Sequence, residues 1–165
     1  MKRSINAMTT ALFAAVVMVM ASFSAFAATI HAPDSFLYDA VRGQIVFGTD
    51  TIKCGLAPSS YTYNRATHTK RSDVTEVTGT GYTAGGQTVT VTTTNDTTNH
   101  KLVIGVPQIV WSGSTTITAR QLFCYKSTGT AANDNLILFA DFGADVSSSG
   151  GTFTVNAITI EYSGF

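Results

Sequence analysis

The residues whose chemistry stands out first are two cysteines, Cys54 and Cys124. They lie far apart in the chain, each within an apolar, strand-like run. An even pair of cysteines in an exported protein is typical of a disulfide. The alternative is two separate core residues, because reduced cysteine packs as a small apolar side chain. The sequence leaves both interpretations open. If a bond forms, we expect the two sulfurs to meet across the core from opposing inward faces.

The titratable side chains form no recognisable catalytic or metal-binding pattern. The three histidines are not spaced as ligands with each other or with a cysteine, and each is expected on the surface or in a loop: His31, His68 and His100. Asp141 and Asp145 lie close in sequence but lack the ligand spacing of a calcium loop. We therefore predict no catalytic residues, no metal, no cofactor and no enzymatic activity.

Three tyrosines are the remaining candidates for ligand contact. Tyr61, Tyr63 and Tyr82 lie in a polar, turn-rich stretch over residues 58–83, which we expect to be irregular. Exposed loop tyrosines can bind a glycan or a protein through their rings and hydroxyls. The alternative, which we favour, is that these rings cover the hydrophobic core.

The N-terminus has the three parts of a secretory signal peptide. Lys2 and Arg3 precede an apolar stretch, and Ala25-Phe26-Ala27 presents small residues at a cleavage site. A membrane anchor would need about 20 apolar residues, and serines interrupt this stretch. We predict a signal peptide at residues 1–27 and one domain at residues 28–165. The mature domain would be exported to the periplasm or the cell exterior, with no membrane association.

The bulk composition favours strands over exposed helices. A chain of 165 residues suffices for one domain. Only 12% of the residues are charged, about half the usual share. Basic and acidic residues are equal in number, 10 each, so nucleic-acid binding through phosphate neutralisation is not expected.

The expected elements are one short helix and several strands. Asp34 or Ser35 can cap a helix whose apolar face would be made of four residues: Phe36, Leu37, Ala40 and Val41. Apolar residues then alternate in strand-like runs over 51–56, 88–92 and 102–106, with a turn at 95–99.

Two later runs, 122–125 and 136–142, are apolar on both faces and are therefore predicted as central strands. A turn is expected to end the second run at 141–143. The apolar phase then reverses between Val155 and Ile158, which predicts a bulge or bend near Asn156-Ala157. The pattern indicates a mainly β fold, a single antiparallel β-sandwich, jelly-roll-like or barrel-like, with one short N-terminal helix.

An ordered series of short motifs carries a family resemblance. It comprises Asp-Thr-Ile-Lys at 50–53, Ala-Thr-His at 66–68, Asp-Val-Thr-Glu-Val-Thr-Gly-Thr-Gly-Tyr-Thr-Ala-Gly-Gly at 73–86, Val-Trp at 110–111, Thr-Ile-Thr-Ala-Arg at 116–120, Tyr-Lys-Ser-Thr-Gly-Thr-Ala at 125–131, Ala-Asp-Phe-Gly at 140–143 and Gly-Gly-Thr-Phe-Thr-Val at 150–155. The series resembles a family of small structural proteins of tailed phages and prophages, over most of the chain from about Phe36 to Phe165.

The resemblance implies a virion component, such as a capsid decoration, head-fibre or tail-associated β domain, and no catalytic residues. Its implied partners are copies of itself or other virion or surface proteins. Two features depart from the family pattern: the signal peptide, and cysteines at what are usually aliphatic strand positions. Both indicate an oxidising compartment, and hence a secreted assembly derived from a virion protein. The alternative function is an exported surface domain that binds a glycan or cell-surface ligand through Tyr61, Tyr63 and Tyr82.

Overall fold

The computed structural model describes residues 23–24 and 29–163. The predicted signal peptide lies outside these residues except for β1 (Phe23–Ser24), a two-residue strand. Within the described ranges, no helix is long and apolar enough to cross a membrane.

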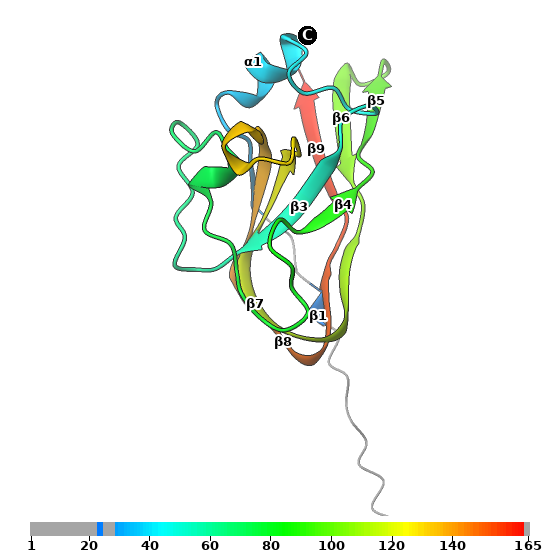
Figure 1. The fold of residues 1–165 in the computed structure, drawn as a ribbon. Helices are drawn as coiled ribbons and strands as arrows, with labels where there is room; N and C mark the ends of the chain where they lie inside the picture. Colours follow the sequence, from blue (N-terminus) through cyan, green and yellow to red (C-terminus); the bar gives the residue numbers. More distant parts are fainter. Residues whose placement is uncertain (1–22, 25–28, 164–165) are drawn as a thin grey trace, which may run out of the picture.

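One long antiparallel ribbon of two chain segments forms the frame of the domain. It consists of β6 (Lys101–Val106), β7 (Ile109–Lys126), β8 (Leu136–Val155) and β9 (Ile158–Ser163). Val106 is opposite Ile158 and Ile109 is opposite Val155, so the register continues unbroken from the β6–β9 pair into the β7–β8 pair. The ribbon bends back on itself at the lower end of the molecule (Figure 1), and its two limbs become the two layers of a sandwich.

The other strands add to one limb or the other. They are β2 (Thr29–His31), β3 (Ile52–Ala57), β4 (Gln87–Val89) and β5 (Thr92–Asp96). The larger sheet has the order β1-β8-β7-β3-β4, with β2 also paired to β8, and the smaller has the order β5-β6-β9. The predicted mainly β sandwich is confirmed, and the two sheets do not close into a barrel.

Backbone geometry explains where the ribbon bends. Gly113, Ser114 and Gly150 all have positive φ, and the pairing register shifts between Trp111 and Thr115. Positive φ and register shifts of this kind increase the local twist and curvature of paired strands. Of the bulge or bend predicted near Asn156-Ala157, the structure shows a bend without a register shift, because β8 ends before it and β9 begins after it in the other sheet.

Two hydrophobic clusters lie on opposite faces of the larger sheet, which confirms that the doubly apolar runs are central strands. The main cluster lies between the sheets and includes Leu122, Leu138 and Ala140, all fully buried. The second lies on the outer face and includes Phe123 and Phe139. The irregular segment 58–83 contains a short 3-10 turn at Arg71–Asp73 and isolated β-bridges at Lys70 and Thr80, and it contributes Tyr61 to this outer cluster.

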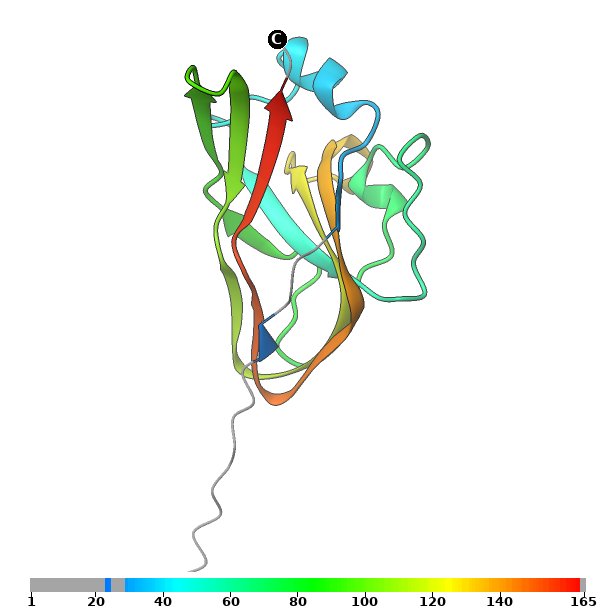
Figure 2. The ribbon, with the colours of Figure 1, turned by 180° about the vertical axis from the view of Figure 1, so that it is seen from behind.

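The helix forms as predicted, as α1 (Phe36–Val41), but its predicted apolar face is wrong. Phe36 and Asp39 are buried, whereas Leu37 and Val41 are 51% and 87% exposed. The helix is under two turns long and meets the sandwich through the Phe36 ring, which lies 6.1 Å from the ring of Tyr162 on β9. The helix lies at one end of the sandwich (Figure 2), and its side chains at Leu37, Tyr38 and Val41 are exposed.

Two strand predictions also need correction. The single strand expected over 88–92 is divided between β4 and β5, which belong to different sheets, because the chain crosses between the layers at Thr90-Val91. The turn expected at 141–143 does not end β8. Gly143 has a φ of 80° and the register shifts opposite it, between Ala119 and Gln121. A bulge therefore bends the strand without interrupting it.

Candidate functional site

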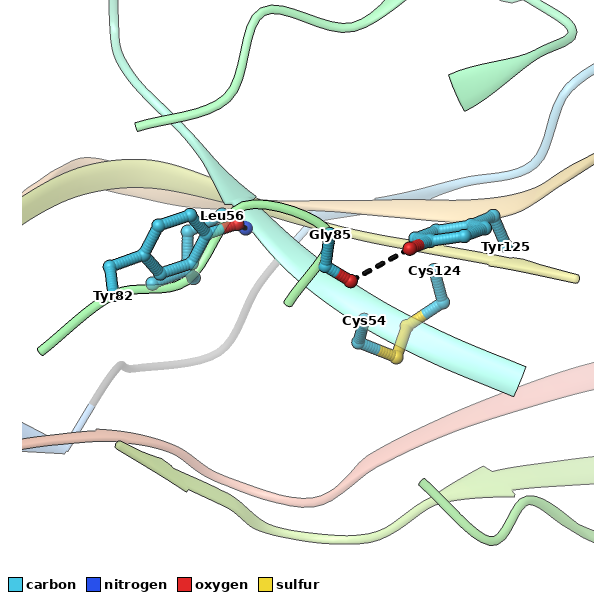
Figure 3. The surroundings of a disulfide bond; sticks show 6 residues. All are labelled: Cys54, Leu56, Tyr82, Gly85, Cys124 and Tyr125. Atoms are coloured by element: carbon cyan, nitrogen blue, oxygen red, sulfur yellow. Dashed lines mark hydrogen bonds between the residues drawn. A yellow bond between two sulfur atoms is a disulfide. The ribbon is translucent and has the colours of Figure 1, made fainter. Parts of the chain in front are cut away.

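The two cysteines form a disulfide, which is one of the two interpretations that the sequence left open, but the bond does not cross the core. Cys54 on β3 is directly opposite Cys124 on β7, with Cα atoms 4.1 Å apart, and both residues are fully buried. Side chains at opposed positions of neighbouring strands point to the same face of a sheet. The bond therefore staples two adjacent strands on the inner face (Figure 3), rather than joining the two layers.

Tyr82 supports the fold and lies apart from the other two candidate tyrosines. Its hydroxyl donates to Glu76 Oε2 at 2.8 Å and accepts from the backbone N–H of Leu56 at 3.0 Å. Burial, together with the Glu76 carboxylate, raises the pKa of Tyr82 well above its usual value. The close approach requires Gly55, since a Cβ there would lie 2.8 Å from the Tyr82 hydroxyl. Tyr82 thus ties the irregular segment to β3.

A partly buried ionic network fixes the same segment to the sheet. Arg71 pairs with Asp134 at 2.9 Å and with Glu76 at 3.1 Å, and its guanidinium lies 5.2 Å from the centre of the Tyr125 ring. Burial opposes ionisation of Asp134, but hydrogen bonds from Thr128 and Arg71 outweigh it and hold its pKa below the usual value. Burial raises the pKa of Tyr125 to about 12, and its hydroxyl donates to the Gly85 carbonyl at 2.7 Å (Figure 3).

Tyr61 and Tyr63 do come together, in a cleft of about 310 Å³ beside the outer face of the larger sheet. Nine residues line it: His31, Ser59, Tyr61, Thr62, Tyr63, Arg120, Gln121, Phe139 and Asp141. Both tyrosine rings stack on Phe139, with ring centres 5.9 and 3.8 Å away. Tyr61 is only 7% exposed, so its ring covers the sheet.

The polar groups of the cleft surround these rings. Arg120 and Asp141 form an ion pair at 2.6 Å with about a third of each side chain exposed. Burial opposes ionisation of Asp141, but the Arg120 hydrogen bond and the Gly143 N–H hold its pKa below the usual value. The Tyr63 hydroxyl is buried, and no described residue forms a hydrogen bond with it. A ring edge, a guanidinium and a carboxylate together can bind hydroxyl-rich ligands through stacking and paired hydrogen bonds.

The remaining candidate residues do not converge. His31 lines the cleft, His68 shares a 2.7 Å hydrogen bond with the Tyr61 hydroxyl, and His100 lies in the β5–β6 turn with a φ of 51°. Asp145 accepts a hydrogen bond from Ser59 at 3.1 Å. Among the described residues, no group of three His, Cys, Asp or Glu side chains could hold a metal ion.

Sequence reasoning missed an exposed apolar surface at the helical end of the sandwich. We call it the α1 patch, and it consists of four residues exposed by 42% or more: Leu37, Tyr38, Val41 and Val46. Three of them belong to a helix that the spacing of apolar residues alone would place against the core. The sequence pattern does not show which apolar residues of the helix are exposed, because this depends on which residue anchors the helix to the sandwich.

The comparisons with known proteins give no match: no family model, no curated protein and no solved structure matches this chain.

Proposed function

We propose that this protein is a non-enzymatic structural subunit of phage descent that is exported and works through protein–protein contacts. We expect each subunit to bind a second copy of itself. Its other partners would be other virion or surface proteins. The observation that carries the proposal is the α1 patch. Contiguous apolar surface on a soluble domain marks an interaction site more often than isolated apolar residues do.

The arrangement of the patch residues supports a contact with another protein surface. Leu37 and Val41 are four residues apart and so lie on one face of α1, and Val41 is 87% exposed. Tyr38 beside them stacks under the Arg42 guanidinium at 5.2 Å, which adds a polar rim. An apolar centre with aromatic and arginine neighbours is the usual composition of a protein interface, and a patch that meets its own copy forms a closed dimer about a twofold axis.

Export is supported by the disulfide, since such bonds persist in oxidising compartments. Cleavage after Ala27 would remove β1, whose two residues pair in parallel with Phe153 and Thr154. It would leave β2, which pairs with β8 at residues 139–141. The mature chain would therefore keep its main N-terminal sheet contact.

The test compares two charge substitutions in the mature domain. Val41→Glu places a carboxylate in the α1 patch, whereas Val110→Glu places one at another exposed valine, on β7 and 39% exposed. Light scattering after size exclusion should show self-association of the wild type, loss of it in Val41→Glu and retention in Val110→Glu. A wild type that stays monomeric at high concentration, and that no virion or surface partner captures, refutes the proposal.

A second candidate function is glycan binding, and the cleft favours it. Tyr63, Arg120 and Asp141 line one hollow, which is the mixture of ring and charge that sugar sites use. Arg120→Ala should then abolish binding on a glycan array while the fold is kept. Lys101→Ala is the matched control, because Lys101 is also ion-paired, to Glu161, but lies on the other sheet. An array with no hits for the wild type eliminates this function.

A further inference from the structure

A lysine, an asparagine and an aspartate from three separate segments meet near the N-terminal end of β8. Lys70 Nζ lies 2.5 Å from Asn135 Oδ1. Asp39 Oδ2, on α1, accepts a hydrogen bond from Asn135 Nδ2 at 2.9 Å. The side-chain amide of Asn135 is therefore held between an amine and a carboxyl group.

Asn135 and Asp39 are buried, Lys70 is partly exposed, and the cluster contains no ion pair that would hold the fold by charge. Asn135 is 6% exposed and Asp39 is 8% exposed. Among the described residues, neither the Asp39 carboxyl nor the Lys70 amine takes part in an ion pair. Burying a carboxyl group without a cation is costly, and such an arrangement is uncommon in a purely structural site.

We propose that Lys70 and Asn135 form an intramolecular isopeptide bond, with Asp39 as the catalytic acid–base group. The Lys70 amine, once its extra proton has passed to solvent from its partly exposed side chain, attacks Asn135 Cγ and forms a new Nζ–Cγ bond. The Cγ–Nδ2 bond then breaks as Asp39, which hydrogen-bonds Nδ2, relays one proton from the attacking Nζ to Nδ2. Nδ2 leaves as ammonia, which takes up a proton from solvent. One ammonium side chain and one amide give one secondary amide and one ammonium ion, so atoms and charge balance without any oxidant or cofactor.

The backbone around the pair holds the two reacting groups in place. Lys70 and Asn135 face each other in an antiparallel β-bridge. Hydrogen bonds flank it on both sides, from Leu136 N–H to the Thr69 carbonyl and from Arg71 N–H to the Asp134 carbonyl, each at 2.9 Å. The bridge fixes the separation of the two side chains, and such fixed proximity accelerates an intramolecular reaction strongly. The burial of Asn135 also limits the access of water to the amide carbon.

The cross-link would fasten the irregular segment to the central strand. Lys70 and Asn135 are 65 positions apart, and the loop they close overlaps the one closed by Cys54 and Cys124. An exported structural subunit would gain a second covalent tie that reducing agents cannot break.

The experiment is intact mass spectrometry of the purified chain, denatured and reduced. The mass of the wild type should be lower by one ammonia than the mass calculated from its sequence. The calculated mass is that of the chain without the signal peptide if the signal peptide has been cleaved. Digestion with trypsin should yield a branched peptide that joins residues 66–71 to residues 127–165, since Arg71 still allows cleavage after the modified lysine. A full, unmodified mass in folded and aged protein overturns the proposal.

An asparagine can also lose ammonia by closing a ring with its own backbone, but that reaction does not join two peptides. The branched peptide therefore identifies the isopeptide bond. Lys70→Arg and Asp39→Asn should each restore the full mass, and Lys101→Arg should keep the ammonia loss. Circular dichroism checks that each variant is folded. Ammonia loss that persists in folded Lys70→Arg refutes the bond, and loss that persists in folded Asp39→Asn refutes the role of Asp39.

Discussion

Replacing Cys54 and Cys124 together with alanine removes the staple between β3 and β7 without leaving a free thiol. The bond joins residues 70 positions apart. For a closed loop of that length, the chain-entropy estimate of the lost stability is about 4 kcal/mol at 25 °C. Both sulfurs lie in the main hydrophobic cluster, so their removal also leaves small cavities that add to the loss.

The assay is urea unfolding of the mature domain followed by circular dichroism and fluorescence. We expect the free energy of unfolding to fall by about 4 kcal/mol, a large part of the 5 to 15 kcal/mol typical of a domain. Reducing agent should lower the stability of the wild type by a similar amount and leave the double variant unchanged. A double variant within about 1 kcal/mol of the oxidised wild type would refute the reasoning.

Three further predictions concern side chains that the structure singles out. Phe36→Ala should cost about 3 to 5 kcal/mol because Phe36 is buried, and Leu37→Ala less than about 0.5 kcal/mol because Leu37 is exposed; equal costs in thermal unfolding would contradict the assigned helix face. Gly55→Ala should destabilise by about 1 to 3 kcal/mol, since its Cβ would lie 2.6 Å from the Phe123 ring; wild-type stability in urea would contradict this. Asp134→Asn should cost about 1 to 3 kcal/mol at neutral pH. The pKa of Asp134 is lowered on folding, so its stabilisation is present above the ordinary aspartate pKa and is lost as the pH falls through the folded value; the variant's pH–stability curve should be flatter in acid, and an unchanged acid slope would count against this.

Strand periodicity predicted much of the fold because it depends on local alternation. The inward face of Ile52, Cys54 and Leu56 and the doubly apolar central strands were both correct. The phase change between Val155 and Ile158 also located the crossing between sheets. Each of these features follows from which side of a strand is buried, and that information is present in neighbouring residues.

Features set by long-range pairing were not predictable in this way. The disulfide could be expected, but its geometry depends on β3 and β7 being neighbours, and no local pattern specifies strand order. The convergence of Tyr61 and Tyr63 on Phe139, and the separation of Tyr82 from them, depend on how the irregular segment folds over the sheet. The meeting of Lys70, Asn135 and Asp39 likewise joins segments that nothing in the sequence connects.

The most direct test of self-association through the α1 patch is a single new cysteine at Val41. The chain has only two cysteines, and these are bonded to each other. A thiol at the centre of a twofold contact would therefore oxidise with its own copy. We predict that Val41→Cys gives a covalent dimer on a non-reducing gel at concentrations where Val110→Cys remains monomeric. A Val41→Cys protein that is as monomeric as the Val110→Cys control would contradict self-assembly through the α1 patch.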